Sequence, residues 1–389
     1  MLEAINFFRL EDSDYIISIR REIHRHPELG FDLDNTVAIV ERELDAMGIQ
    51  HTREFGPGSV VGFINYDCEG KTLALRADMD ALPVQEENDV EYASEIPGRM
   101  HACGHDAHTA MLLGAARALK RAEDQLTCRV KLMFQPSEEC DVSGAECMVN
   151  HGVMDDVDEV VGMHVNNNWE AGKIGYRAGP LQAGCHPYTI EFFGKSTHAT
   201  TPQNGCDALA MAIKAYNDIY MMKCRELSPF DEHVLSISCV QGGHVHNVIP
   251  AYAKMLISLR FYDIEVNNKI DSRIKMICQH AAEELGGTVK FTDSVSTGAV
   301  INNPVVTEKL RAAAEKALGA ENVFEMPKKM SSEDFAHYLQ KKPGGFVNIG
   351  TRNEAKGCVF GVHNEKMQLD EDVLIKGSKV FVQYVLDNK

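Results

Sequence analysis

The stretch KTLALRADMD, residues 71–80, decides the fold class of this chain. It is a short apolar run that ends in two aspartates, Asp78 and Asp80. Such a run is typical of a strand that is covered on both faces of a mostly parallel sheet. Because sites in these sheets lie at the carboxyl ends of the strands, the two aspartates mark a candidate site.

The segments around this strand alternate between helix and strand patterns. The expected helices cover 35–48 and 108–122, and further strands cover 129–135 and 159–165. Either Asp34 or Asn35 is placed to cap the first of these helices. Strands that alternate with helices predict an α/β fold, with a mostly parallel sheet and helices on both faces.

The pattern changes near residue 180. The next expected elements are strand 187–193, helix 205–224, strands 233–241 and 253–262, helix 266–285 and strand 287–292. This βαββαβ order is that of a ferredoxin-like α+β domain. Helix 304–318, strand 344–350 and helix 370–387 then return to the first domain. We therefore expect one domain over 1–182 and 295–389, with an inserted domain over 183–294.

Composition narrows the class of protein. The net charge of −18 argues against nucleic-acid or anionic membrane partners, which need basic patches. No apolar stretch approaches the roughly 20 residues that span a bilayer. The first residues lack the features of a secretory signal, and the eleven cysteines show no framework spacing. We therefore expect a cytoplasmic protein with free thiols.

The segment MHACGHDAHTAM, residues 100–111, carries Cys103 and three histidines. Cys103 could be a buried small hydrophobe, a structural zinc ligand, a thiol nucleophile or part of an open catalytic metal site. Paired Cys-x-x-Cys knuckles, which are usual in structural zinc sites, do not occur in the chain. A thiol nucleophile at a helix start stays possible on this segment alone.

A second segment, FQPSEEC (134–140), ends a predicted strand with Glu138 and Glu139. On an extended chain these neighbours point to opposite sides. One could then bind a metal while the other acts as a general base, which is what metal-assisted hydrolysis requires. The alternative is a pair of surface glutamates.

Two further histidines extend the candidate set. His164 follows EVVGM at a predicted strand end, and His363 lies in VFGVHNE. A lone histidine is more often structural, but several at strand-to-loop junctions favour a site. The candidate ligands are Cys103, His105, Glu139, His164 and His363. Asp80 could hydrogen-bond a ligating imidazole or the base, and His101 and His108 could line the site.

The chain resembles the two-domain metallo-amidohydrolases that include aminoacylases and glutamate-type carboxypeptidases. It is most similar to the branch with hippurate hydrolases, indole-acetyl-amino-acid hydrolases and N-acetyl-diaminopimelate deacetylases. The motifs that carry this resemblance are RREIHRHPELGF (20–31), LRADMDALP (75–83), MHACGHDAHTAMLLGAA (100–116), FQPSEE (134–139), GMHV (162–165), HNVIP (246–250), SSEDFAHY (331–338) and GVHNE (361–365). Together they run through nearly the whole chain.

The resemblance implies a zinc-peptidase-like fold with an inserted ferredoxin-like lid domain that also forms a homodimer. It implies that the five candidate ligands bind two divalent metal ions and that Glu138 is the general base. Asp80 would support the site. Thiolate and imidazole ligands favour zinc, although manganese, cobalt or nickel could also serve. Cys103 would then be a metal ligand rather than a nucleophile.

The expected lid domain contains GKSTHATTP (194–202), which resembles the GKGGHAAxP segment of the family. By that resemblance His198 reaches the active site of the partner subunit and stabilises the oxyanion. Asn247 and Arg260 match residues that grip the carboxylate of the substrate. The sequence departs from the family at Ser196-Thr197, where Gly-Gly is usual, and at Gln203, where a histidine is common.

The reaction implied is hydrolysis of the amide bond of an N-acyl amino acid, which is the expected small-molecule substrate. A dipeptidase or carboxypeptidase would use the same metal site. Two alternatives belong to other functional classes. One is a non-catalytic binding protein that kept the fold, and the other is a thiol hydrolase that uses Cys103.

Overall fold

The computed structural model describes residues 3–293 and 297–389, which form two compact units. The first unit comprises residues 1–181, 301–328 and 334–389, and the second comprises residues 182–300 and 329–333. The predicted domain boundary between 294 and 295 lies outside the described residues.

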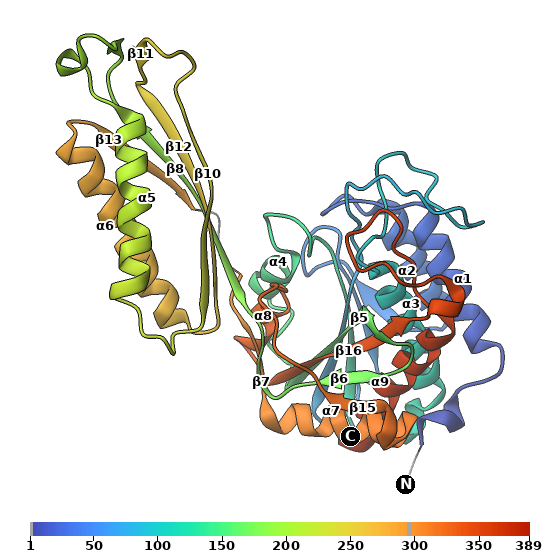
Figure 1. The fold of residues 1–389 in the computed structure, drawn as a ribbon. Coiled ribbons are helices and arrows are strands. Elements are labelled where there is room, and N and C mark those ends of the chain that lie inside the picture. Colours follow the sequence, from blue (N-terminus) through green and yellow to red (C-terminus); the bar gives the residue numbers. More distant parts are fainter. Residues whose placement is uncertain (1–2, 294–296) are drawn as a thin grey trace. The chain divides into compact units, whose positions relative to one another are not determined.

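The first unit is built on an eight-stranded sheet with the order β1-β2-β4-β3-β5-β16-β6-β15 (Figure 1). The central neighbours β4, β3, β5 and β16 run parallel, while β1, β2 and β6 pair antiparallel with their neighbours towards the centre. The strands are β1 (Gln50–Thr52), β2 (Val60–Ile64), β3 (Thr72–Asp78), β4 (Arg129–Gln135), β5 (Glu159–Glu170), β6 (Ile174–Tyr176), β15 (Val323–Glu325) and β16 (Gly344–Arg352). The prediction of an α/β fold with a mostly parallel sheet is confirmed.

The helices of this unit pack in sequence-distant pairs. Helix α3 packs against α1 and α9, and α9 also packs against α7, while α4 packs against α8. The bounds are α1 (Asp12–Arg25), α2 (Asp34–Ala46), α3 (His105–Arg121), α4 (Gly144–Asn150), α7 (Pro304–Leu318), α8 (Ala336–Leu339) and α9 (Leu374–Asn388). Strand β3 is buried along its whole length, so the sheet and the α1–α3–α9 layer share one core.

The predicted cap of α2 is wrong. Neither Asp34 nor Asn35 caps this helix; its N-cap residue is Leu33, which makes no side-chain cap hydrogen bond. Instead the carboxylate of Glu28 accepts the backbone N–H groups of Asn35 (2.9 Å) and Thr36 (2.8 Å). A carboxylate near a helix N-terminus can accept the unpaired backbone N–H groups of the first turn, as a local cap residue does. The residue that caps α2 therefore lies outside the segment in which the cap was expected.

The second unit has the predicted βαββαβ order. Its sheet has the order β10-β12-β8-β13, all antiparallel, and carries helices α5 and α6. The elements are β8 (Gly184–Phe193), α5 (Ala208–Arg225), β10 (His233–Gly242), β12 (Tyr252–Phe261), α6 (Ile264–Glu284) and β13 (Thr288–Asp293). A short ladder joins β9 (Thr197–His198) to β11 (Val248–Ile249). Among the described helices of the chain, none is long and apolar enough to cross a membrane.

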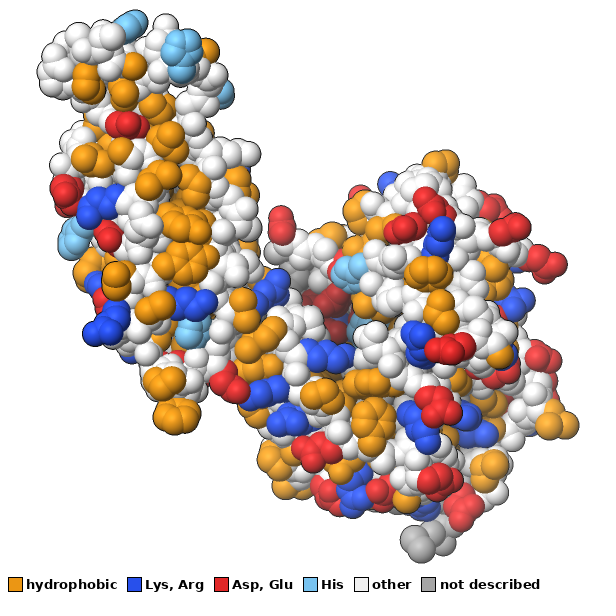
Figure 2. Space-filling view, viewed as in Figure 1, with side chains coloured by type: hydrophobic (Ala, Val, Ile, Leu, Met, Phe, Trp, Pro, Cys, Tyr) orange, Lys and Arg blue, Asp and Glu red, His pale blue; other side chains and the backbone are white. Residues whose placement is uncertain are grey.

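The visible surface of the first unit carries charges of both signs. Figure 2 shows lysine and arginine side chains interspersed with aspartate and glutamate over this face. Hydrophobic side chains gather along the second unit in the same view. Helix α5 contributes two of its exposed apolar side chains, Ile213 and Met221.

Candidate metal centre

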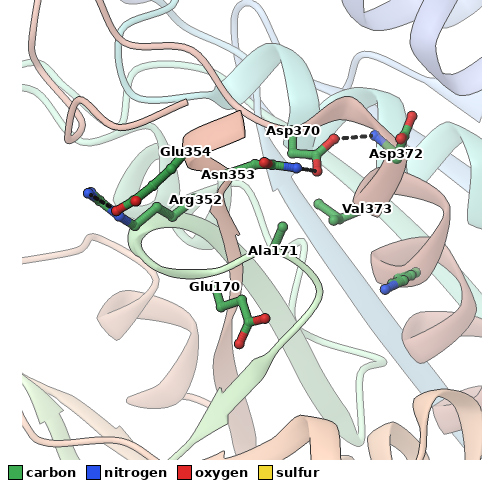
Figure 3. A pocket seen from close by; sticks show the side chains of 9 residues that line it. Glu170, Ala171, Arg352, Asn353, Glu354, Asp370, Asp372 and Val373 are labelled. Atoms are coloured by element: carbon green, nitrogen blue, oxygen red, sulfur yellow. Dashed lines mark hydrogen bonds and ion pairs between the residues drawn. The ribbon is translucent and has the colours of Figure 1, made fainter. Parts of the chain in front are cut away.

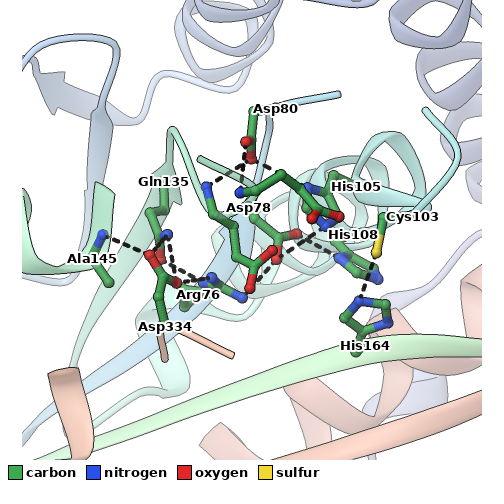
Figure 4. Close-up of polar contacts among 12 residues, drawn as sticks. Arg76, Asp78, Asp80, Cys103, His105, His108, Gln135, Ala145, His164 and Asp334 are labelled. Carbon is green, nitrogen blue, oxygen red and sulfur yellow. Dashed lines mark hydrogen bonds and ion pairs between the residues drawn. The ribbon is translucent and has the colours of Figure 1, made fainter. Parts of the chain in front are cut away.

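Four parts of the first unit converge on one polar cluster, and Figure 4 labels Cys103, His105 and His164 among its residues. Cys103 and His105 lie at the start of α3, on either side of Gly104, which adopts a left-handed conformation with φ of 86°. The two glutamates follow β4, and His164 lies in β5. His363 comes from the loop after β16, and its N–H donates to the carbonyl of Ala102 (2.8 Å). That hydrogen bond ties the His363 loop to the residue next to Cys103.

The predicted ligands form three overlapping triads in which the nearest ligand atoms lie within 4.8 Å of one another. The triads are Cys103–His105–His164, Cys103–Glu139–His363 and His105–Glu138–Glu139. Cys103 Sγ lies 3.3 Å from His164 Nε2, and His363 Nε2 lies 3.0 Å from Glu139 Oε1. The structure therefore brings all five candidate ligands together, with Glu138 beside them.

His164 does not end its strand. Strand β5 continues to Glu170, so the predicted position of His164 at a strand end is wrong. In the sheet, Gly162 of β5 pairs with Arg76 of β3, and β3 ends two residues later at Asp78. His164 therefore lies level with the end of the neighbouring strand, because β5 is the longer of the two.

Asp80 organises the loop that carries the glutamates. One oxygen of its buried carboxylate accepts the backbone N–H of Glu138 and the other accepts that of Glu139, each at 3.0 Å. The first oxygen also lies 3.3 Å from Nδ1 of His105. Asp80 thus contacts the imidazole of a candidate ligand and holds the two carboxylate-bearing residues at once, which is how supporting carboxylates act at metal sites.

The two glutamates do not diverge as an extended chain would make them. Ser137 before them has a positive φ of 53°, and the segment is bent rather than extended. Both carboxylates reach to within 4.8 Å of a ring nitrogen of His105. The expectation that they point to opposite sides is wrong, because their backbone follows Asp80 rather than a strand.

His105 and His164 both engage an oxygen atom through Nδ1, while Nε2 of His164 contacts Cys103 Sγ (3.3 Å). Nδ1 of His164 lies 2.6 Å from the carbonyl of Val165, which can only accept, so Nδ1 carries the proton. Nδ1 of His105 faces Asp80 in the same way. Nε2 of His105 is buried and makes no hydrogen bond to any residue that the structure describes. A buried imidazole nitrogen that makes no hydrogen bond, beside a thiol and carboxylates, suits a transition-metal ion once it is deprotonated.

The pKa shifts agree with a site that needs a cation. Burial raises the pKa of the Cys103 thiol, and the charges of Glu139 and Glu138 raise it further. Burial alone would lower the pKa of His105, but the aspartates nearby outweigh it and raise the pKa to about 10. A thiol held in its protonated form is unlike an activated nucleophile, whose pKa is depressed. These shifts count against the thiol-hydrolase alternative.

His108 lines the site, since its ring centroid lies 4.5 Å from that of His164 and 5.3 Å from that of His105, and it also links strands. Its Nε2 accepts the N–H of Val165 (2.9 Å), so its Nδ1 donates to Asp78 (2.5 Å). Burial lowers the pKa of His108, in keeping with this neutral form. His108 therefore fastens the end of β3 to the residue that follows His164.

A buried polar network beneath the cluster was not identified from the sequence. The guanidinium of Arg76 donates to Gln135 (2.7 Å), Asp78 (2.7 Å) and Asp334 (2.9 Å). Asp334 also accepts from Ser143 (2.6 Å). Arg76 lies within the apolar run of β3. Because a buried charge must be paired and hydrogen-bonded, this arginine is the feature of the sequence that indicates such a network.

The second unit carries the other predicted residues. The N–H of Ala199 donates to the carbonyl of Asn247 (2.9 Å), so His198 and Asn247 lie next to each other at the β9–β11 ladder. Ser196 donates to the carbonyl of Ile249 (2.9 Å), so its hydroxyl ties down the turn where Gly-Gly is usual. Arg260 lies near the far end of β12, where it donates to Ser332 (2.9 Å).

A separate cavity of about 520 Å³ lies elsewhere in the first unit (Figure 3). It is lined by Glu170, Ala171, Arg352, Asn353, Glu354, Asp370, Asp372, Val373 and Lys376. None of the predicted site residues lines it. Its charges are of both signs, and several pair with one another, as Arg352 does with Glu354 (3.0 Å).

The comparisons with known proteins agree on one family. The sequence profile of peptidase family M20/M25/M40 matches residues 74–387. A thermostable carboxypeptidase of Saccharolobus solfataricus is 38% identical, with 95% of this chain and 94% of the relative covered. The N-acetyl-L-cysteine deacetylase of Bacillus subtilis is 34% identical, with 96% and 88% covered.

A solved structure extends the likeness to the fold. It is described as a dinuclear metal binding peptidase from the M20 family, from Bacillus subtilis. It superposes with a TM-score of 0.82 at 29% identity and covers 97% of this chain and 99% of its own.

Proposed function

Because this chain belongs to peptidase family M20/M25/M40, we propose that it is a metal-dependent hydrolase that cleaves the amide bond of N-acyl amino acids. The products are a carboxylic acid and a free amino acid. The observation that carries the proposal is the set of overlapping triads with Glu138 beside them. The relative that removes the acetyl group of N-acetyl-L-cysteine supports this class of substrate.

The donor set fits two divalent metal ions. One triad offers a thiol and two imidazoles, and a second shares Cys103 and adds Glu139 and His363. The orphaned Nε2 of His105 supports a bound cation. The dinuclear relative of known structure supports the number of ions. Soft and borderline donors favour zinc, while cellular availability decides between zinc, manganese, cobalt and nickel.

When bound, the ions would polarise the scissile carbonyl and lower the pKa of a water molecule. In the mechanism we propose, Glu138 accepts a proton from that water and later delivers it to the leaving nitrogen. Asp80 holds the backbone of Glu138 in place through its 3.0 Å hydrogen bond. Because the Nδ1 atoms of His105 and His164 face Asp80 and the Val165 carbonyl, their Nε2 atoms would be the ones that bind the metal.

The second unit supports a role for His198 in the active site of a partner subunit. His198 and Asn247 lie beyond the Tyr252 end of β12, whereas Arg260 lies eight residues along that strand. At roughly 3.3 Å per residue, the two ends are about 26 Å apart. A small substrate cannot touch both ends of one unit. We propose that His198 and Asn247 act in trans while Arg260 binds the carboxylate in cis.

This arrangement requires a homodimer, which we propose forms through the inserted unit acting as a lid. Strand β10 is an edge of its sheet, and α5 exposes Ile213 and Met221. Exposed apolar side chains and an unpaired strand edge are features of association surfaces.

We also propose that the enzyme works in the cytoplasm. All eleven cysteines are described and all are free thiols, which suits a reducing compartment.

A carboxypeptidase is the second candidate, supported by the relative from Saccharolobus solfataricus. The chemistry at the scissile amide is the same, so a substrate panel separates the two. Purified protein is stripped with chelator, reloaded with zinc, manganese, cobalt or nickel, and assayed with acetyl-, benzoyl- and indole-acetyl-amino acids and with dipeptides.

We expect activity that disappears with chelator and returns with metal, with higher kcat/KM for N-acyl amino acids than for dipeptides. Full activity in excess chelator would overturn the metal mechanism. A preference for peptides would replace the acylase assignment with the peptidase one.

A further inference from the structure

We propose that Asp106, held by Arg20 and His24 of α1, is a positioning residue that fixes the turn carrying Cys103 and His105. The inference rests on the proposed metal centre and adds residues from a different helix to it. Asp106 is the second residue of α3 and follows His105 directly. It contacts α1 rather than the cluster of ligands.

The contacts of Asp106 with α1 are short and fully buried. Arg20 Nε lies 2.7 Å from Asp106 Oδ2, and the two side chains are 1% and 0% exposed. His24 Nδ1 lies 2.7 Å from the same oxygen and is equally buried. Arg20 Nε makes a charge contact without hydrogen-bond geometry, whereas His24 makes a hydrogen bond to Asp106. Removing one member of a buried ion pair leaves an uncompensated charge, so the three side chains depend on one another.

The cluster is in turn contacted by two other segments, the loop between β3 and α3 and the turn before α9. Glu86 lies 3.2 Å from Nε2 of His24, and its other oxygen accepts the N–H of Ser94 (2.6 Å). Glu371, just before α9, accepts from Arg20 (3.2 Å). The ring of Tyr92 lies 4.8 Å from the guanidinium carbon of Arg20. Arg20 and His24 are therefore held in a rigid frame and can hold Asp106 in turn.

The geometry of the helix pair shows why this anchor matters at the site. Helices α1 and α3 run antiparallel, since Asp12 at the start of α1 pairs with Arg121 at the end of α3 (2.5 Å). Arg20 and His24, near the end of α1, thus meet the start of α3. Each end of the pair has a buried aspartate that contacts an arginine, although Arg121 is 20% exposed and Arg20 only 1%. Only the Asp106 end is beside predicted ligands.

The turn before α3 is held by backbone hydrogen bonds, such as that of the His363 N–H to the Ala102 carbonyl (2.8 Å), and by two side-chain anchors that flank His105. Gly104 lies between Cys103 and His105 in a left-handed conformation, and no side chain caps the helix there. On one side Asp80 holds the imidazole of His105. On the other side Asp106 holds the backbone of the same turn to α1. Loss of the second anchor would let both ligands move relative to Glu139 and His164.

The test compares two matched variants, Asp106→Asn and Asp12→Asn. Both remove the charge of a buried carboxylate that pairs with an arginine across the same two helices. Metal affinity is measured on the full-length protein by competition with a chromophoric chelator, using zinc and manganese. Thermal unfolding of the metal-free proteins is measured in parallel.

We expect both variants to unfold at lower temperature than the wild type. Only Asp106→Asn should weaken metal binding, by about 10- to 100-fold, as expected for the loss of a residue that orients ligands. Asp12→Asn should bind metal within about twofold of the wild type. Equal affinities in the two variants, or wild-type affinity in Asp106→Asn, would overturn the inference.

A second variant covers the case in which Asp106→Asn does not fold. His24→Gln removes one of the two groups that hold Asp106 and should weaken metal binding in the same direction, though less. Wild-type affinity in His24→Gln, with Asp106→Asn unfolded, would also overturn the inference. If the wild type binds two ions tightly but hydrolyses no N-acyl amino acid, the proposed function fails while the affinity comparison still decides the role of Asp106.

Discussion

At the scale of single residues, the division of work between Glu138 and Glu139 is the sharpest claim. The N–H groups of both residues bind Asp80, but only Glu139 lies 3.0 Å from His363. Glu138→Gln should keep both metal ions, because the side-chain shape is preserved and its neighbour still binds. Turnover should fall by at least 10²-fold, since the amide cannot accept the proton. Elemental analysis and kcat on one preparation provide the test.

Glu139→Gln is the matched comparison. It should lower metal occupancy, because an amide binds a divalent cation more weakly than a carboxylate does. If Glu138→Gln retains near-normal kcat, Glu138 is not the general base. If the two variants lose metal equally, the assigned division is wrong.

His24 gives a prediction about pH. Its ring nitrogens face two carboxylates, those of Asp106 and Glu86, so it can donate to both only as an imidazolium. Burial and Arg20 lower its pKa, but the carboxylates outweigh them and the net shift is upward. A raised pKa in the folded state means that this stabilisation is complete below the unfolded pKa of about 6.5 and is lost as pH rises through the folded value.

The difference in Tm between wild type and His24→Gln should therefore be largest below about pH 6 and should shrink as pH rises. Each pKa unit of upward shift corresponds to about 1.4 kcal/mol. The measurement is made in excess chelator, so that metal binding does not contribute. A difference that stays constant or grows with pH would show that His24 is not held as a cation.

The candidate metal ligands could be predicted from the sequence because cysteine, histidine and glutamate are residue types that bind transition metals. Cysteine, histidine and paired glutamates in separate motifs indicate a metal site before any fold is known. The supporting residues lack such a signal. Arg20 and Asp106 are ordinary charged residues in the sequence, and only burial at 1% and 0% exposure reveals what they do.

At the scale of helices and strands, the contact between α1 and α3 depends on a glycine. A Cβ added at Gly114 would lie 2.6 Å from both Cγ1 and Cδ1 of Ile16. Gly114→Ala should therefore destabilise the protein by about 1–3 kcal/mol through overpacking. The better helix propensity of alanine, worth about 1 kcal/mol, offsets part of this loss. Thermal or urea unfolding of the metal-free protein measures the change.

The rescue is the decisive part of this prediction. Ile16→Ala in the same chain removes the two closest clashing atoms and leaves Ser378 Oγ at 2.8 Å, so the double variant should lose less stability than the sum of the two single variants. Strict additivity would mean that the two helices can separate at this point without cost.

The boundaries of elements were less predictable than their existence. Strand β4 and helix α7 begin and end where the sequence pattern indicates, at 129–135 and 304–318. Strand β5 runs five residues beyond the predicted 165, because its pairing with β16 continues to Glu170. Partners far along the chain, such as Glu28 at the start of α2, cannot be identified from local patterns.

At the scale of the whole molecule, the candidate metal ligands lie in one unit and the candidate substrate-binding residues lie in the other. The first unit holds the metal-ligand candidates on long-range contacts that its parallel sheet makes possible. The second unit carries His198 and Asn247 at one end of its sheet and Arg260 near the other. Within one copy of this unit, residues about 26 Å apart cannot hold one small substrate, at roughly 3.3 Å per strand residue. If His198 and Arg260 both contact the substrate, as we propose, the site needs two copies of the unit.

Complementation between two inactive variants tests that requirement. His198→Ala should lose most activity because the oxyanion loses a positioned donor, and Glu138→Gln should lose it because the base is missing. In a mixed dimer, the site with an intact Glu138 receives an intact His198 only if His198 acts in trans. Half of the randomly mixed dimers are hybrids, and each would have one working site, so about a quarter of wild-type activity should return. Differently tagged chains show whether subunits exchange. If they exchange and activity stays at the level of the separate variants, His198 does not act in trans. The substrate would then bind at one end of the inserted unit only.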